Sequence, residues 1–205
     1  MAQRTTLRPD LDHPPAAAAT RSVGDRPGVR VAPTSAVTIR RGQAPDAVCV
    51  SALGIQVFLD TYATEGIRGS LAREATETLS PAAVAVLFGD SATTFILAET
   101  GGYLVGFAQL TASIGHALVP YRAPTELKRL YVQERFTGCG IGTMLLLRAE
   151  RAAFAAGAAA VWLQAWSGNR RALDFYARRG YADLGPTPFT IEDERFENRL
   201  FARGR

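Results

Sequence analysis

The chain of 205 residues has few of the residues that stabilise metal-bound or disulfide-linked folds. It contains two cysteines, Cys49 and Cys139, and two histidines, and no C-x-x-C spacing occurs. Two thiols are too few for a disulfide framework or a cysteine-based zinc site. We therefore expect free thiols in a reducing compartment, and no metal cofactor.

Lysine is almost absent as well. Lys128 is the only one, and every other basic residue among the 23 is arginine. The formal net charge is +4 and the isoelectric point is about 9.4, which would suit an anionic partner. The arginines are scattered, however, and no basic run interleaved with aromatic residues marks a nucleic-acid surface. We expect no nucleic-acid partner.

Long hydrophobic segments are also missing. The longest mainly apolar stretch, Ala152 to Ala165, is shorter than a membrane span and contains Gly157. The first residues include Arg4 and Arg8 but no apolar core of a signal peptide. We expect a soluble, cytoplasmic protein without a membrane partner.

Composition divides the chain into two parts. Residues 1–35 are rich in Pro, Ala, Arg, Asp and Thr and have no periodic apolar pattern, which predicts a disordered tail. Residues 36–205 have room for one ordinary domain. The hydrophobic share of 47% and charged share of 20% are typical of a globular protein.

Hydrophobic periodicity and turn signals predict a mixed α/β domain around one sheet. The first helix, opened by Pro45 and Asp46, should bury a face made of Val48, Ala52, Ile55 and Leu59. The other expected elements are strands at 37–40, 94–98, 104–111, 126–132 and 159–166, helices at 80–88, 141–156 and 169–179, and a final hairpin from Tyr181 to Phe201. Residues 66–69 are expected to be a flexible join, Gly101 and Gly102 a hairpin turn, and Gly157 a helix C-cap.

The turn from Thr137 to Gly142 is the most informative segment, because it joins an expected strand to an expected helix. The start of a helix leaves backbone N–H groups unpaired and carries partial positive charge, and glycines let an anion approach it closely. A Walker A loop is excluded because no lysine follows Gly142, and a dinucleotide fingerprint is excluded because Thr143 takes its last glycine position. A structural turn with no ligand remains the alternative.

The same segment resembles motif A of the GNAT superfamily of N-acetyltransferases, usually written Q/R-x-x-G-x-G/A. Thr137 is aligned with the position where Gln or Arg is usual, and Gly140 and Gly142 fit the glycine positions. The resemblance implies that the strand end and the turn bind acetyl-CoA, through Leu130, Tyr131, Val132, Thr137, Gly138, Cys139, Gly140, Ile141, Gly142 and Thr143.

A second segment, Asn169 to Tyr181, resembles the superfamily's motif B helix, N-x-x-A-x-x-F-Y-x-x-x-G-F/Y. Asn169 and Tyr176 are seven residues apart and should share one helical face, with the small Ala172 between them. The resemblance adds Asn169, Ala172, Phe175 and Tyr176 to the expected cofactor site. The alternative is that Phe175 and Tyr176 are core aromatics only.

Membership of this superfamily implies a GNAT-like fold: a central mixed, mostly antiparallel, twisted sheet flanked by about four helices. It also implies an acyltransferase that moves an acetyl group from acetyl-CoA to a primary amine. By resemblance, the backbone N–H near Leu130 would bind the acetyl oxygen, Tyr176 would protonate the departing sulfur, and Glu126 would act as general base. Glu126 could instead be a strand-edge carboxylate paired with Lys128 or Arg129.

The segments 126–132, 161–166 and 188–194 are similar to the bacterial spermidine/spermine acetyltransferases, which implies a polyamine acceptor. A peptide, protein or antibiotic amine is the alternative substrate, and a non-catalytic module that binds acetyl-CoA is the alternative function. Relatives are commonly homodimers, so we expect a homodimer. The sequence does not identify the acceptor.

Overall fold

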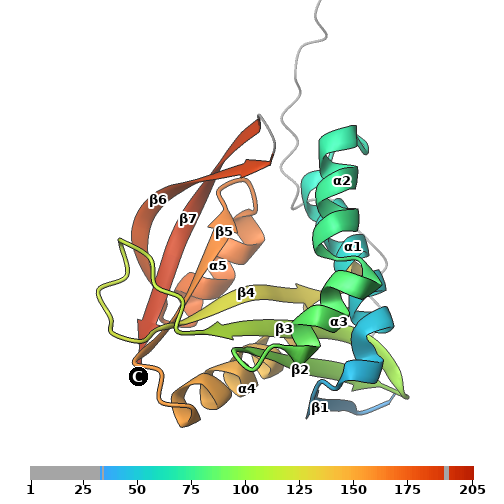
Figure 1. The fold of residues 1–205 in the computed structure, drawn as a ribbon, viewed down its shortest axis with the longest axis horizontal. Coiled ribbons are helices and arrows are strands. Elements are labelled where there is room, and N and C mark those ends of the chain that lie inside the picture. The colour runs from blue at the N-terminus through green and yellow to red at the C-terminus, as the bar shows by residue number, and fades with distance from the viewer. Residues whose placement is uncertain (1–32, 34, 192–193) are drawn as a thin grey trace, which may run out of the picture.

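The computed structural model describes residue 33 and residues 35–191 and 194–205, and within them one seven-stranded sheet carries five α-helices (Figure 1). The predicted tail, residues 1–35, lies outside the described residues apart from 33 and 35. The elements are β1 (Val37–Arg41), η1 (Ala44–Asp46), α1 (Ala47–Tyr62), α2 (Gly69–Thr78), α3 (Pro81–Gly89), β2 (Thr93–Thr100), β3 (Tyr103–Ala112), β4 (Thr125–Val132), η2 (Glu134–Phe136), α4 (Ile141–Ala155), β5 (Ala160–Trp166), α5 (Arg170–Arg178), β6 (Ala182–Ile191) and β7 (Glu194–Gly204).

The strand order is β1-β2-β3-β4-β5-β7-β6. Every neighbouring pair is antiparallel except β4 and β5, which are parallel. The expected mixed, mostly antiparallel sheet is therefore confirmed. Since parallel neighbours need a crossover connection, the chain between β4 and β5 contains α4.

The helices cover both faces of the sheet (Figure 1). On one face α4 and α5 pack over a core that includes Leu145 and Leu146, neither more than 1% exposed. On the other face α1 and α3 pack over Phe95, Leu97 and Phe107. Burial of each of these large side chains contributes roughly 1.5–3 kcal/mol, so both helical layers are held to the sheet by apolar contact.

Turns and helix ends follow their local residues closely. The Ser80 hydroxyl accepts a hydrogen bond from the Ala83 amide, as expected of an N-cap before Pro81. At the end of α4, Gly157 has φ +93°, and the Ala158 amide donates to the Ala153 carbonyl, which is a Schellman motif. Gly101 and Gly102 both have positive φ and form the expected β2–β3 turn.

The buried face predicted for the first helix is wrong. Val48 is 64% exposed and Ala52 is also exposed, while Ile55 and Leu59 are only partly buried. The residues that α1 buries are Ala47, Val50, Ser51, Leu53, Gly54 and Phe58. Apolar residues occur on most sides of this helix, so more than one row at spacing three to four exists, and only packing against the sheet selects one.

Helix α2 was not among the expected helices. It begins at Gly69, where the sequence predicts only a flexible join. Its buried face consists of Ser70, Leu71 and Ala75, and the remaining residues are mostly polar. Such a sparse apolar row is a weak helical signal, because tertiary packing rather than propensity stabilises short helices.

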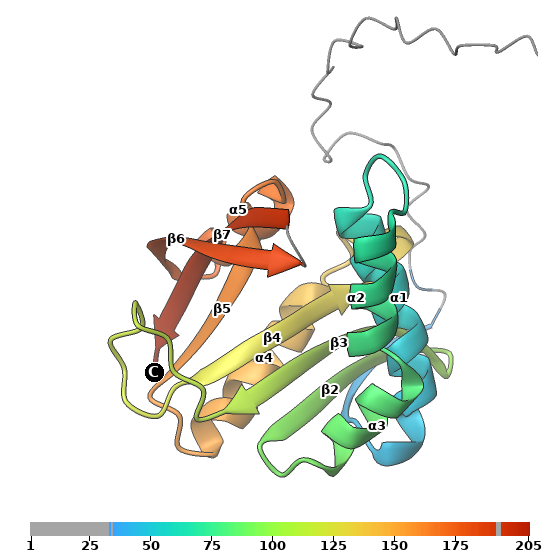
Figure 2. The same ribbon diagram turned by 45° about the horizontal axis from the view of Figure 1, so that its top comes forward.

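Strands β4 and β5 separate soon after they meet. Only two residue pairs join them, Thr125 with Val161 and Glu126 with Trp162. Two residues beyond Glu126, Lys128 is a bulge in β4, since Arg129 pairs with Gln109 and Leu127 pairs with Leu110. A bulge bends its strand and increases the local twist. Figure 2 shows β4 turning toward α1 and β5 toward α5, and we call the region between them the split.

Gly106 fixes how closely β3 approaches the far end of β4. A Cβ atom at this position would lie 2.7 Å from the Tyr131 carbonyl oxygen, a distance that requires the backbone to shift. We expect Gly106→Ala to lower the free energy of unfolding by about 1–3 kcal/mol, measured by chemical denaturation. Gly89→Ala is the control, because a Cβ there meets nothing within 4 Å. Equal stability of the two variants would contradict this assignment.

Candidate active site

The glycine turn has a backbone that only glycine adopts readily. Gly138 and Gly140 both have φ +81°, in the left-handed region. Gly140 is the N-cap of α4, and the helix begins at the next residue. The turn therefore brings the chain from the end of β4 directly into the first turn of a 15-residue helix.

The first turn of α4 carries unpaired backbone donors. No side chain caps it, and its first helical hydrogen bond runs from the Met144 amide to the Gly140 carbonyl, 3.1 Å. The amides of Ile141, Gly142 and Thr143 precede that bond and have no partner inside the helix. With the partial positive charge of the helix N-terminus, they form a suitable binding site for a phosphate group.

The positive φ values also correct the alignment of motif A. The glycines expected to match the motif were Gly140 and Gly142, but Gly142 lies inside α4, and the left-handed residues are Gly138 and Gly140. Moved two residues earlier, Q/R-x-x-G-x-G/A matches Arg135, Gly138 and Gly140. The arginine is then present in its usual position, and Thr137 no longer departs from the pattern.

Arginines that the motif search missed lie around this helix start. Arg179, the C-cap of α5, donates a hydrogen bond to the Thr143 hydroxyl. Arg171 forms two 2.8 Å hydrogen bonds with the Glu134 carboxylate. Arg135 lies over the Phe136 ring, 5.0 Å from its centroid. Their charges would attract the phosphates of a nucleotide cofactor. The sequence did contain a signal for these arginines, because basic residues occur at both ends of α5.

Helix α5 packs close beside the start of α4. A Cβ at Gly142 would lie 3.8 Å from the Phe175 ring, so the helices approach here at ordinary contact distance. Expected cofactor residues from both motifs pack in the same core cluster: Leu130, Val132, Cys139, Ile141, Ala172, Phe175 and Tyr176. Asn169 is the N-cap of α5, where its side-chain oxygen accepts from the Ala172 amide at 3.1 Å. This bond gives Asn169 a structural role, and its contact with cofactor stays a prediction.

Tyr176 is buried in that cluster, 8% exposed. Its ring lies against the rings of Phe175, Tyr181 and Phe201, with centroids 5.2–6.1 Å apart. Burial raises the pKa of the Tyr176 hydroxyl above its ordinary value of 10, and the neighbouring Tyr131 and Tyr62 raise it further. The hydroxyl therefore keeps its proton at neutral pH. Both interpretations of Tyr176, core aromatic and proton donor, are compatible with this environment.

The side chains of β4 alternate between the two faces of the sheet. Leu130 and Val132 pack with α4 and α5, whereas the Tyr131 side chain lies on the α1 side, 5.4 Å from the Phe107 ring. All three of these strand residues were expected to bind the cofactor, but the Tyr131 side chain lies on the opposite face of the sheet from the other two. Any contact it makes with a ligand on the α4 side would come from its backbone.

Backbone amides of β4 face the split beyond Glu126. The Gln133 amide donates to the Val105 carbonyl of β3, 3.0 Å away. Because hydrogen-bonding direction alternates along a strand, the amides of Val132 and Leu130 should point to the opposite side, where β5 no longer pairs with β4. The register therefore favours the Leu130 amide as a donor that faces the split.

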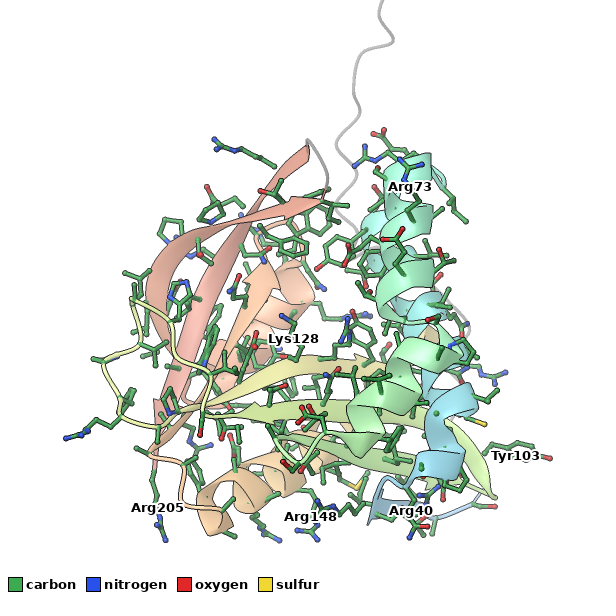
Figure 3. The ribbon with its side chains drawn as sticks, in the orientation of Figure 1. Arg40, Arg73, Tyr103, Lys128, Arg148 and Arg205 are labelled. Atoms are coloured by element: carbon green, nitrogen blue, oxygen red, sulfur yellow. The ribbon has the colours of Figure 1, made fainter. Side chains whose placement is uncertain are left out.

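Glu126 lies at the vertex of the split, in the last residue pair between β4 and β5. It is buried, 8% exposed, and its carboxylate is 3.5 Å from the Lys128 ammonium. Figure 3 shows Lys128 beside the diverging strands. The carboxylate therefore has the partner that the alternative interpretation expected, and Arg129 instead donates to the Gln109 side chain at 2.7 Å.

An aromatic group spans the open end of the split. Tyr62, the last residue of α1, lies 5.7 Å from Trp166 at the end of β5 and 6.1 Å from Phe196 of β7, measured between ring centroids. Trp166 and Phe196 are 6.4 Å apart. We call these three residues the aromatic bridge. Sequence patterns did not reveal it, because Tyr62 lies more than 100 residues before Trp166 and Phe196 along the chain.

The described part of the chain lacks two other kinds of feature. No group of three or more His, Cys, Asp or Glu side chains is arranged to hold a metal ion there. None of its helices is long and apolar enough to cross a membrane.

The two glycines with positive φ at the ends of α4 give a matched test of the proposed phosphate site. A Cβ at Gly140 or at Gly157 would meet nothing within 4 Å, and each would cost a similar conformational strain of about 1–2 kcal/mol. We expect Gly140→Ala to weaken coenzyme A binding by about tenfold, because it disturbs the exposed amides. Gly157→Ala should lose similar stability and retain its affinity in calorimetry. Equal affinities would argue against the site.

Comparison with known proteins agrees with this geometry. Residues 64–181 match the model of the acetyltransferase (GNAT) family. A chain from Lactobacillus delbrueckii subsp. lactis, described as an uncharacterized N-acetyltransferase in the pepI 3′ region, is 21% identical over 159 residues, which cover 78% of this chain and 90% of that one.

Two solved structures show the same fold at low sequence identity. The PaiA N-acetyltransferase of Thermoplasma acidophilum, solved with coenzyme A, has a TM-score of 0.64 and 21% identity and covers 83% of this chain and 99% of its own. The yncA protein of Salmonella typhimurium, solved with acetyl-CoA, has a TM-score of 0.60 and 18% identity and covers 83% and 94%. Because the family model spans more than half of the sequence and includes both the glycine turn and α5, the chain belongs to the acetyltransferase (GNAT) family.

Proposed function

We propose that this protein transfers an acetyl group from acetyl-CoA to a primary amine of a small molecule. One observation carries the proposal: β4 and β5 part after two residue pairs, and β4 then leads through the glycine turn into the uncapped first turn of α4. The turn offers donors for the phosphates of coenzyme A, and the split leaves amides of β4 without a partner strand, so that an extended arm can bind there. The relatives solved with coenzyme A and acetyl-CoA support this assignment.

Each candidate residue has a role that its position supports. The amine nitrogen attacks the thioester carbonyl carbon, so that a C–N bond forms and the C–S bond breaks. The Leu130 amide stabilises negative charge on the carbonyl oxygen. Glu126, at the vertex, accepts the proton that the amine loses, directly or through water, and Tyr176 donates a proton to the departing thiolate sulfur.

The identity of the acceptor can be tested with a panel of amines. Spermidine is the acceptor that the resemblance to spermidine/spermine acetyltransferases suggests, and peptide and aminoglycoside amines are the others. Acidic residues that would attract a polyamine include Asp60, Glu65 and Glu197, all exposed. Glu192 and Asp193 lie outside the described residues, as does the side chain of Glu194.

The test is release of the coenzyme A thiol, measured with acetyl-CoA and each amine of the panel. Turnover with any member supports the transferase. Binding of acetyl-CoA without turnover would favour a non-catalytic module, and absence of binding would overturn both. The expected homodimer remains a prediction, which light scattering of the purified protein tests.

Removal of the Tyr176 hydroxyl separates its two interpretations. We expect Tyr176→Phe to lower kcat by about 10²-fold or more while acetyl-CoA affinity stays nearly unchanged, because the ring and its packing remain. Tyr181→Phe is the matched control: it lies 5.7 Å away in the same cluster, and burial together with Glu150 raises its hydroxyl pKa. A core-only role for Tyr176 would leave the kcat of both variants at the wild-type value.

The raised pKa of Tyr176 has a consequence for the pH profile. A hydroxyl whose pKa lies above 10 stays protonated throughout the range up to pH 10, while the acceptor amine increasingly loses its proton. We expect kcat/KM to rise with pH toward pH 10 without a falling limb due to Tyr176. Circular dichroism should confirm that the protein stays folded. A falling limb below pH 10 that disappears in Tyr176→Phe would contradict the assigned ionisation state.

A further inference from the structure

The face of β4 that looks toward α1 carries an arginine in an unusual setting. Arg129 is half-buried, and its guanidinium donates a 2.7 Å hydrogen bond to the side-chain oxygen of Gln109. Gln109 is itself buried, 3% exposed, so it holds the guanidinium in one place. Tyr131, two residues along the same face, is close enough for Arg129 to lower its pKa by charge and hydrogen bonding, although burial raises that pKa more.

The groups that fix Arg129 are neutral. Gln109 is an amide, and Tyr131 keeps its proton at neutral pH because burial raises its pKa. Among the residues that the structure describes, no carboxylate lies within ion-pair distance of Arg129. Glu74 of α2 is near enough to raise the pKa of Tyr131 and of Tyr62, but it forms no ion pair with the guanidinium.

A partly buried charge without a counter-ion is costly, and the cost is offset when an anion binds. A guanidinium held by one neutral neighbour still has several N–H donors in a planar fork, which matches the geometry of a carboxylate. Arg129 is therefore prepared to bind an anion that the protein itself does not supply.

The position of Arg129 indicates whose anion it would be. It lies three residues beyond Glu126, where β4 has already left β5. It shares its face with the candidate base Glu126 and with Tyr131, opposite the α4 face that the cofactor would occupy. A ligand of Arg129 would thus lie on the acceptor side of the split, with the aromatic bridge beyond it.

We propose that the acceptor is an amine that also carries a carboxylate, bound by Arg129, with an apolar body against Tyr62, Trp166 and Phe196. The proposal rests on the transferase function and names its substrate class. An amino acid with a large apolar side chain has this combination of groups. A polyamine fits the same face less well, because Lys128 and Arg129 are adjacent cations there and Glu126 is already paired with Lys128.

The test uses three amines with one skeleton: phenylalanine, phenylalaninamide and phenethylamine, with spermidine as a cationic comparison. We expect the kcat/KM of the wild-type protein for phenylalanine to be at least about tenfold above its values for phenylalaninamide and phenethylamine, which lack the carboxylate. A tenfold factor corresponds to the loss of one hydrogen bond to a charged group. Equal kcat/KM for the three, or a preference for spermidine, would overturn the proposal.

Variants separate anion binding from a structural role. Arg129→Gln should raise KM for phenylalanine about tenfold or more and leave KM for phenethylamine and for acetyl-CoA unchanged, and Arg129→Lys should recover part of the loss. Arg148→Gln is the matched control, since Arg148 is exposed on α4, away from Lys128 (Figure 3). If Arg129 only supports the strand, both amines will lose activity equally in Arg129→Gln.

A binding measurement keeps this proposal distinct from the transferase function. Calorimetry with coenzyme A present compares phenylalanine binding to wild type and to Arg129→Gln. Binding that is lost in the variant supports the anion site even if no amine is turned over, in which case the transferase function fails. Phenylalanine turnover with equal affinity in both proteins supports the transferase and overturns the role of Arg129.

Discussion

The loss of pairing between β4 and β5 is the constraint on which the site depends. Two residue pairs join these strands, and from Lys128 onward the bulge in β4 directs them apart. An unpaired strand edge inside a sheet would normally be costly, because its amides have no partners. In the proposed mechanism one of these amides, that of Leu130, binds the carbonyl oxygen of the thioester. Strand β4 continues through the glycine turn into α4, so the strand edge and the helix start are close in sequence.

Strand β4 separates two chemical environments. Leu130 and Val132 belong to the apolar layer under α4 and α5, while Glu126 and Arg129 lie on the face toward α1, where they contact the polar side chains of Lys128 and Gln109. Because successive side chains of a strand point to opposite faces, the two sets of residues lie on opposite sides of β4. Cofactor and acceptor could therefore approach from opposite faces and meet at the edge of the same strand, without either passing through the other's environment.

Local signals in the sequence predicted the parts of the fold that depend on few residues. Gly157 and the Gly101–Gly102 turn act through their own backbone and Ser80 through its own hydroxyl, and all were placed correctly. The buried face of α1 was wrong because its apolar residues allow several faces and only the sheet selects one. Motif A was found but aligned two residues late, since the sequence alone does not show which glycines have positive φ. Contacts between distant segments, such as Arg129 with Gln109 and the aromatic bridge, leave no local pattern.

Lys128 is the only side-chain amine of the chain, and it is half-exposed at the vertex of the split. A protein that handles amines thus presents almost none of its own to a reactive acyl donor. The arginines that provide its positive charge are not nucleophilic at neutral pH, because the guanidinium is always protonated. Lys128 is therefore the one side chain that self-acetylation could modify, and its ammonium is 3.5 Å from the Glu126 carboxylate. Among the side chains, an amine-directed fluorophore would label Lys128 alone. Binding of an acceptor in the split would change the surroundings of that label.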